Sequence, residues 1–396
     1  MRTKVAVVGG GSTGSSILFH LAKRGLADSV LIEKGPAVAS GQTSRSTALV
    51  RTHYTVPVVA KMALRSYEVF KNFNREVPGY ESGYIETGLL IGVSSQYEQS
   101  VRQNLDMLHG MGIVSRFVDP GDVARLEPFI DTSSFSSMVF EPHMGYAEPS
   151  TTASSYASAA QAMGARVLSE TALLGIAKAP EGYSLSTTKG EIIASEVVLA
   201  TGAWSGPIFR SLGIDLPIKV VRHPVAIYDR PQEFRGVRPV VFDFPRSAYY
   251  KPEGQSLLFV GSMEQELDAT SAAVDPDNYD QGITFDETEK FTGWTSEVYP
   301  LMGEKGTFLR GYSGVYDNTP DQQPIIDELS AYGYPGLHCL VGLSGHGFKL
   351  CPEYGRIMAA LVVDGRFDDY DVSVFRLGRF AAGQLLRSRY AISTVG

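Results

Sequence analysis

The chain begins with a hydrophobic pattern that predicts a strand, a helix and a second strand. A short apolar run, Val5-Ala-Val-Val8, enters a glycine turn, and a second run, Ser29-Val-Leu-Ile, ends in an acid at Glu33. Short apolar runs bounded by glycine are typical of buried parallel strands. The pattern therefore predicts a β-α-β unit at the start of the chain.

Later segments predict a mixture of helices and short strands. Apolar residues at helical spacing and Ala/Ser-rich stretches predict helices, whereas alternating residues predict strands and a β-meander. Glycines near 190, 202 and 342–347 mark turns at the ends of predicted strands. The predicted helices lie at about 57–76, 96–111, 119–126, 149–164, 287–297 and 352–363, and the predicted strands at about 87–93, 166–200, within 217–300 and at 337–341.

The order of these elements predicts an α/β protein with two discontinuous domains. The late return to a strand and a glycine-rich turn places the end of the chain beside its beginning. We expect one domain from residues 1–82, 145–216 and 305–396. A second domain, from residues 83–144 and 217–304, is inserted between those segments.

Composition narrows the classes of function. The chain has 396 residues, 43% of them hydrophobic, and a net charge of −8, which argues against nucleic acid or an anionic membrane as main partner. No apolar run approaches the length of a membrane span. Two cysteines and seven scattered histidines suggest no metal site. The first motif starts so near Met1 that no signal peptide fits, so we expect the cytoplasm.

The opening glycine turn has the spacing of a dinucleotide-binding motif. Gly9 allows a tight turn, Gly11 lets backbone amides approach a pyrophosphate, and Gly14 lets the helix pack closely on the strand. The helix N-terminus attracts phosphate, and Glu33 is placed to accept hydrogen bonds from ribose hydroxyls. The alternatives are a structural glycine turn and, for Glu33, a solvated acid at a strand end.

A second glycine-rich turn, Gly345-His-Gly-Phe-Lys349, lies between a predicted buried strand and a helix. A helix N-terminus and Lys349 at this turn would stabilise the negative charge that a flavin gains on reduction. Arg51 carries a guanidinium that suits a carboxylate, and with Lys349 it could hold that of an amino acid. The alternatives are a plain strand–helix turn with an exposed lysine, and a surface arginine.

Together with Thr201-Gly202-Ala-Trp204 and Ser344, these motifs resemble the FAD-dependent D-amino-acid oxidase superfamily, most of all its sarcosine oxidase branch, which includes dimethylglycine dehydrogenase-like and proline dehydrogenase-like chains. The resemblance implies an FAD-binding Rossmann-like domain of the glutathione-reductase type and a mostly antiparallel β substrate domain. It also implies the pairing of Arg51 with Lys349 on the substrate carboxylate. The FAD contacts that it implies are Gly9, Gly11, Ser12, Thr13, Gly14, Glu33, Lys34, Ser46, Thr47, Ala48, Leu173, Gly202, Trp204, Gly345, His346, Gly347, Phe348 and Lys349.

Two positions depart from the monomeric sarcosine oxidase pattern. Tyr312 stands where that enzyme tethers FAD through a cysteine, so we expect non-covalent FAD. Phe259 stands where it has a lysine that assists oxygen reduction, so the electron acceptor is O₂ or another molecule.

The predicted reaction is hydride removal from the carbon next to the amine of a small sarcosine-, proline- or glycine-like amino acid, followed by hydrolysis of the imine. His346 is a candidate base, although a packing role is favoured, and Tyr250 and Tyr249 are candidates to line the substrate pocket. One alternative is 2-hydroxy-acid oxidation with His53 or His346 as base. Others are an NAD-dependent dehydrogenase, which has no use for the turn at 345–349, and a flavin-binding subunit of a hetero-oligomer. The chain could be a homo- or hetero-oligomer.

Overall fold

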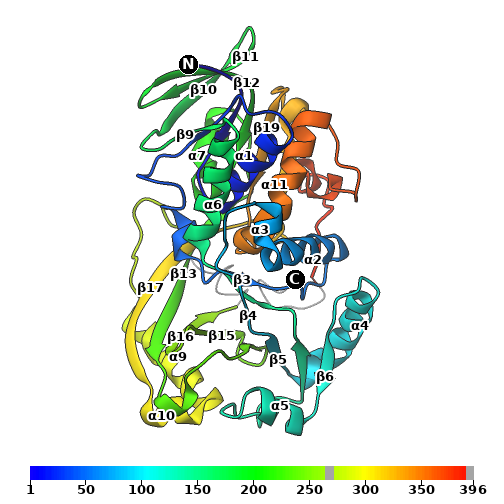
Figure 1. Cartoon of the computed structure of the whole chain (residues 1–396), viewed down its shortest axis with the longest axis vertical. Helices are drawn as coiled ribbons and strands as arrows, with labels where there is room; N and C mark the ends of the chain where they lie inside the picture. Colours follow the sequence, from blue (N-terminus) through cyan, green and yellow to red (C-terminus); the bar gives the residue numbers. More distant parts are fainter. Residues whose placement is uncertain (264–271, 389–396) are drawn as a thin grey trace.

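Two β-sheet units lie one above the other in the computed structural model, which describes residues 1–263 and 272–388 (Figure 1). The upper unit contains the first and last helices of the chain, and the lower unit contains most of the inserted segments. The upper unit is therefore built from segments near both ends of residues 1–388.

The upper sheet is parallel at its centre and antiparallel at one side. Its strands run in the order β10-β11-β12-β1-β2-β9, with β19 beside β12 and β18 beside β19. β1 pairs in parallel with β2 and β12, and β12 with β19, which confirms the predicted β-α-β unit. The strands are β1 (Arg2–Val8), β2 (Ser29–Ile32), β9 (Arg166–Leu168), β10 (Leu173–Ala179), β11 (Gly182–Thr187), β12 (Gly190–Leu199), β18 (Ile325–Glu328) and β19 (Leu337–Val341).

Alternate residues of β1 face opposite sides of this sheet. Val5 and Val7 belong to a core shared with α1 and α11, whereas Ala6 and Val8 belong to a second core that includes residues of α7. A Cβ on Gly355 of α11 would lie 2.2 Å from Ser16 Oγ of α1, so these two helices approach closely. The helices of this unit are α1 (Ser12–Lys23), α2 (Pro57–Lys71), α3 (Phe73–Glu76), α6 (Pro149–Ala162), α7 (Ser205–Ser211) and α11 (Gly347–Asp364).

The lower sheet is almost entirely antiparallel. Its order is β17-β13-β16-β15-β14-β5-β7-β6, and only the β14–β5 pair is parallel. Its strands are β5 (Leu89–Val93), β6 (Arg116–Val118), β7 (Ser137–Glu141), β13 (Lys219–Asp229), β14 (Val240–Asp243), β15 (Ala248–Glu253), β16 (Leu257–Ser262) and β17 (Thr307–Asn318). Its helices are α4 (Glu98–His109), α5 (Pro120–Leu126), α9 (Phe285–Val298) and α10 (Pro300–Lys305).

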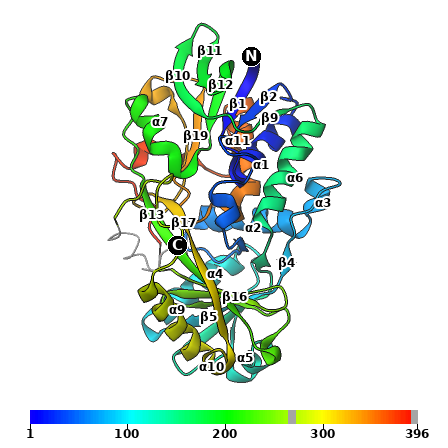
Figure 2. The ribbon, with the colours of Figure 1, turned by 90° about the vertical axis from the view of Figure 1, so that its left-hand side faces the viewer.

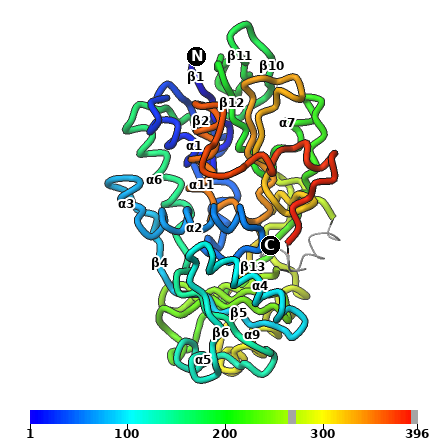
Figure 3. The backbone as a smooth tube through the Cα atoms, turned by 90° about the vertical axis from the view of Figure 1, so that its right-hand side faces the viewer, coloured from blue at the N-terminus to red at the C-terminus, as the bar shows by residue number. Residues whose placement is uncertain are grey.

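Short elements and one long strand join the two units. β17 lies after the expected domain boundary at 305, yet it pairs with β13 along the lower sheet (Figure 2). The C-terminal stretch descends beside the upper unit (Figure 3), and Thr55 Oγ1 donates to Ser388 Oγ at 3.1 Å. The short strands β3 (Leu49–Val50), β8 (Gly145–Tyr146) and β4 (Ile85–Glu86) form a small sheet of their own.

One predicted helix start is wrong. Proline favours the first helical turn, so the sequence suggested a start near Pro352, but α11 begins at Gly347 and contains Pro352. The earlier start matters because it puts the N-terminus of α11 within the glycine turn at 345–347.

Candidate active site

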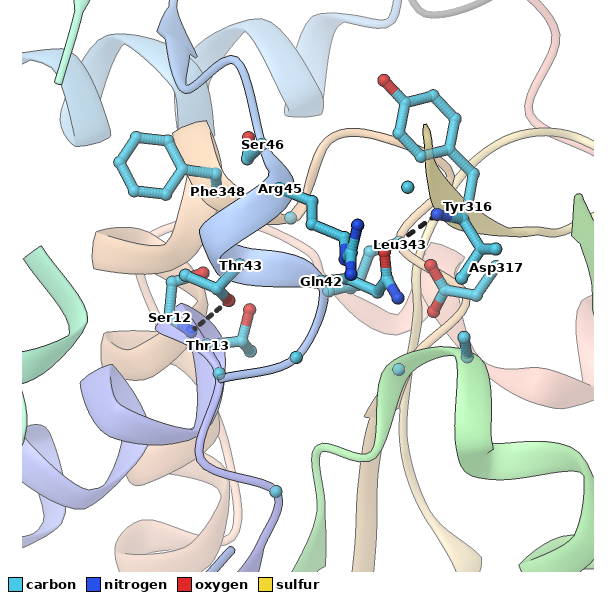
Figure 4. A pocket seen from close by; sticks show the side chains of 18 of the residues that line it. Ser12, Thr13, Gln42, Thr43, Arg45, Ser46, Tyr316, Asp317, Leu343 and Phe348 are labelled. Atoms are coloured by element: carbon cyan, nitrogen blue, oxygen red, sulfur yellow. Dashed lines mark hydrogen bonds between the residues drawn. The ribbon is translucent and has the colours of Figure 1, made fainter. Parts of the chain in front are cut away.

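A cavity of about 480 Å³ lies where the two units meet. The upper unit lines it with the β1–α1 turn, the segment 41–51, and residues around 172, 204 and 347. The lower sheet contributes residues of β13, β14, β15, β16 and β17. Figure 4 shows Ser12 and Thr13 below Thr43 at one side, and Gln42 and Arg45 reaching toward Tyr316 and Asp317 at the other.

The first glycine turn forms one end of the cavity. Gly9 has a φ of +109°, and a Cβ there would lie 2.3 Å from the Ala200 carbonyl oxygen, so only glycine fits. Gly14 is not among the lining residues; a Cβ there would lie 1.9 Å from the Gly9 carbonyl oxygen. The cavity is lined at the start of α1 by Gly11, Ser12 and Thr13, and the N-cap residue, Gly11, has no side chain to cap the helix. Its N-terminal dipole therefore faces the cavity.

Glu33 lies at the tip of β2 with its carboxylate held by backbone amides. Gly10 N donates to Oε2 and Gly35 N donates to Oε1, both at 2.6 Å. Glu33 is 9% exposed and lines the cavity. This orientation leaves further lone pairs of the two oxygens available to hydroxyl donors.

The neighbouring wall combines apolar, aromatic and charged groups. This wall is lined by Leu173, Gly202, Trp204 and Lys34. Lys34 Nζ lies 4.1 Å from the Trp204 ring centre and 2.5 Å from Asp277 Oδ1, and Trp204 Nε1 donates to the same oxygen at 2.9 Å. Asp277 lines the cavity too, and no motif in the sequence had pointed to it.

The second glycine turn brings α11 to the cavity by its N-terminus. Gly345, Gly347, Phe348 and Lys349 line the cavity, whereas His346 does not. The His346 ring packs against Tyr54, whose hydroxyl lies 3.0 Å from Nδ1. Burial and the charges of Lys349 and Arg51 hold the pKa of His346 well below its usual range. His346 is thus a buried neutral side chain behind the turn.

Lys349 and Arg51 place two buried basic side chains at the cavity wall. Lys349 Nζ donates to the Gly345 carbonyl at 2.9 Å. Burial, and then the charge of Arg51, hold the pKa of Lys349 well below its usual range. Arg51 is 2% exposed, its guanidinium carbon lies 3.9 Å from the Tyr54 ring centre, and it donates to the His53 carbonyl. An anion in the cavity would relieve the repulsion between the two cations.

The segment between these cations and Glu33 also shapes the cavity. Ser46 and Thr47 line it; Ala48, with a φ of +53°, does not, but its N–H donates to Ser46 Oγ at 3.0 Å. Two lining residues that no motif signalled are Gln42, whose Oε1 accepts from Val315 N at 2.8 Å, and Thr43, whose Oγ1 accepts from Ser12 N at 3.0 Å (Figure 4).

Arg45 is a further cavity residue that no motif in the sequence signalled. In the structure it lines the cavity, and its guanidinium donates to Ser313 O at 3.1 Å and to Gln281 Oε1 at 2.6 Å. It therefore links the upper unit to the lower sheet.

The lower sheet contributes one of the two tyrosines that the sequence suggested for the pocket. Tyr249 lines the cavity, whereas Tyr250 packs against Tyr299 and its hydroxyl donates to the Trp294 carbonyl at 3.2 Å. Of the two candidates, Tyr249 is therefore the one on the cavity wall, and Tyr250 faces the other side of the sheet. Adjacent residues of a strand face opposite sides of the sheet, and the sequence did not show which side faces the cavity.

His223 and Tyr316 form a polar patch that sequence reasoning missed. Their rings stack at 4.2 Å, and both line the cavity. Burial lowers the pKa of His223 to about 4, so its ring is neutral near pH 7. His53, the other candidate base, does not line the cavity; its Nδ1 lies 2.7 Å from Glu141 Oε1.

The two positions that depart from the sarcosine oxidase pattern both lie outside the cavity lining. On β17 the lining begins at Gly314, two residues after Tyr312. Phe259 is paired across the sheet with Lys251, whose Nζ donates to the Thr47 carbonyl at 2.7 Å from behind the lining. Both cysteines are buried away from the cavity.

Within residues 1–263 and 272–388, no group of three or more His, Cys, Asp or Glu side chains could hold a metal ion. In the same part of the chain, every helix is too short or too polar to cross a bilayer.

Comparisons with known proteins agree with this arrangement. The chain is 24% identical to monomeric sarcosine oxidase of Bacillus sp. (strain B-0618), with 97% of each chain covered. It is 25% identical to human mitochondrial sarcosine dehydrogenase, covering 95% of this chain but 41% of that protein. The solved structure of L-proline dehydrogenase from P. horikoshii matches with a TM-score of 0.87 at 25% identity, over 97% of this chain and 99% of that one.

The family match extends over most of the chain. The family described as DAO, FAD dependent oxidoreductase, matches residues 4–361, a range that includes both glycine turns, Arg51 and Lys349. The chain therefore belongs to the DAO family of FAD-dependent oxidoreductases, whose relatives include amino acid oxidases and dehydrogenases.

Proposed function

We propose that the protein oxidises the C–N bond of a small amino acid of the sarcosine, proline or glycine type. The observation that carries this proposal is the pair of buried cations, Arg51 and Lys349, on the wall of the cavity beside the N-terminus of α11. A guanidinium and an ammonium held in a poorly solvated site form a strong receptor for a carboxylate. Fixing the carboxylate would orient the carbon that loses its hydride.

The cavity residues fit FAD. The N-termini of two helices, α1 and α11, open onto it, and Glu33 presents an oriented carboxylate. When bound, FAD accepts the hydride and later releases both electrons to an acceptor. Gly11, Ser12 and Thr13 would hold the pyrophosphate, Glu33 the ribose, and the backbone at Gly345–Lys349 the flavin end. We propose non-covalent binding, because no cysteine lines the cavity.

Oxidation of 2-hydroxy acids remains the second candidate, and one observation favours it. It needs a base for the hydroxyl proton, and His223 is a neutral histidine on the cavity wall. A pKa near 4 makes that base weak. An amine that arrives unprotonated needs no base, so amine oxidation is the better fit.

The deciding experiment is anaerobic bleaching of the FAD-loaded protein. Sarcosine, proline, glycine, D-alanine and 2-hydroxyglutarate would be mixed in turn with the protein while flavin absorbance is followed. Bleaching by an amino acid supports the proposal, and bleaching by 2-hydroxyglutarate alone overturns it. Admitting air then separates an oxidase, which recolours quickly, from a dehydrogenase. A yellow protein that none of them bleaches would point to a subunit that needs a partner.

A further inference from the structure

We propose that Glu141 is a positioning residue for substrate binding, because it holds the backbone from which Arg51 reaches the cavity. This inference rests on the proposed function, in which Arg51 binds the carboxylate of the substrate. Glu141 itself does not line the cavity.

Glu141 holds the two residues that follow Arg51. One carboxylate oxygen, Oε1, lies 2.7 Å from Nδ1 of His53. The other, Oε2, accepts from the Thr52 hydroxyl at 3.4 Å. One side chain of the lower sheet thus contacts both members of a dipeptide that belongs to the upper unit.

Two further polar groups of the dipeptide have partners nearby. His53 Nε2 lies 3.4 Å from Asn104 Nδ2, on α4. Thr52 N donates to Met144 Sδ at 2.9 Å. His53 and Asn104 are 0% exposed and Glu141 is 1% exposed, so the network lies away from bulk solvent.

The network acts on Arg51 through the His53 carbonyl. The Arg51 guanidinium donates to that oxygen while it stacks on the neighbouring Tyr54 ring. If His53 lost its anchor, the carbonyl could rotate and the guanidinium would lose the acceptor that aims it. Glu141 is a firm anchor, because β7 has β5 on one side and β6 on the other.

Stability alone does not account for this arrangement. Buried polar networks usually contribute no more to stability than apolar residues of the same volume, since each group must be removed from water. A network of this kind does fix one geometry. The network here fixes the geometry of the Arg51 guanidinium on the cavity wall.

The test measures binding of butyrate, a carboxylate that cannot be oxidised at a C–N bond, to the FAD-loaded protein through the perturbed flavin spectrum. Butyramide serves as the uncharged probe. We expect Glu141→Gln to weaken butyrate binding at least about tenfold and to leave butyramide binding unchanged. Glu127→Gln is the matched control, since Glu127 is a buried carboxylate of the lower unit outside this network, and it should bind butyrate normally.

A double-mutant cycle separates positioning from general damage. If Glu141 acts through Arg51, then Glu141→Gln has no further effect in an Arg51→Gln background. Equal weakening in both backgrounds would overturn the inference. So would equal loss of butyrate and butyramide.

A second pair of variants covers the case in which Glu141→Gln does not fold. His53→Asn keeps a hydrogen-bond donor near Glu141 and should bind butyrate nearly as tightly as the wild type does. His53→Leu removes that donor and should bind butyrate more weakly. Equal butyrate binding by the two variants overturns the inference. If the wild type and Arg51→Gln bind butyrate equally, Arg51 does not bind the carboxylate, and both the proposed function and this inference are contradicted. If those two differ but Glu141→Gln behaves like the wild type, only the inference fails.

Discussion

The charge of Lys349 depends on burial, on the nearby Arg51 and on whether an anion is bound. Burial and the nearby Arg51 favour its neutral form and lower its pKa. A carboxylate bound between the two residues would favour the charged form. Substrate binding is therefore linked to protonation of Lys349.

This linkage predicts how binding changes with pH. Because the pKa of Lys349 is lowered, the ammonium loses its proton at a lower pH than a free lysine does. We expect the Kd for butyrate to rise as the pH is raised from about 6 to 10. In Lys349→Met, binding should be weak and nearly independent of pH over this range. A wild-type Kd that stays flat would contradict a role for this ammonium.

Glu127 supplies a residue-scale prediction outside the site. Burial raises its pKa to about 7, so the folded state favours the protonated acid and loses stability as pH rises from the unfolded value toward and beyond 7. Glu127→Gln should therefore gain stability relative to the wild type by about 2 kcal/mol between pH 5 and pH 8. Urea unfolding at the two pH values measures this difference. A constant difference would show that Glu127 is ionised in the folded protein throughout.

At the scale of elements, the position of α1 at the cavity depends on a close approach between its backbone and the turn that precedes it. α1 lies against the strand that precedes it only because Gly14 has no side chain: the added Cβ would overlap the Gly9 carbonyl. Gly293, within α9, is not required for close packing, since a Cβ there would meet nothing within 4 Å.

These two glycines make a matched pair of variants. Gly14→Ala should separate α1 from β1 and greatly weaken FAD binding. Gly293→Ala should raise the stability by up to about 1 kcal/mol, because alanine is the better helix former. FAD content after purification and thermal unfolding check both outcomes. Normal FAD content in Gly14→Ala would contradict the close packing seen between α1 and the turn.

The sequence predicted the elements around the glycine turns well, and those of the lower sheet less well. Gly9, Glu33 and Lys349 are tied to local patterns that demand one geometry. Tyr249, His223 and Tyr316 have no such pattern, because they reach the cavity only through strand pairing and the orientation of the sheet. No pattern signalled Arg45 for the same reason: its partners, Ser313 and Gln281, are distant in sequence.

For the whole molecule, the connection between residues 272 and 282 holds the two units together at the cavity. Asp277 binds Lys34 and Trp204, and Gln281 binds Arg45. These contacts link the segment between β16 and β17 of the lower sheet to Lys34, Arg45 and Trp204 around the proposed FAD site.

Loss of one contact should therefore loosen the cofactor. Asp277→Asn weakens the interaction with Lys34, which is partly exposed and so contributes modestly. We expect FAD release to be about two- to fivefold faster, measured by the recovery of flavin fluorescence after dilution. Asp286→Asn, an exposed change at the start of α9, should leave the rate unchanged. Equal rates for Asp277→Asn and the wild type would show that this segment does not retain FAD.

The packing of α1 against α11 has a consequence for the synthesis of the protein. α1 ends at Lys23, and the helix that covers it begins about 320 residues later, at Gly347. At typical translation rates this gap takes on the order of half a minute. During that time the emerging chain carries a helix whose α11-facing side is uncovered, and half of a cofactor site. Newly made protein should therefore acquire FAD only after α11 has left the ribosome, and nascent chains that stall earlier should depend on chaperones.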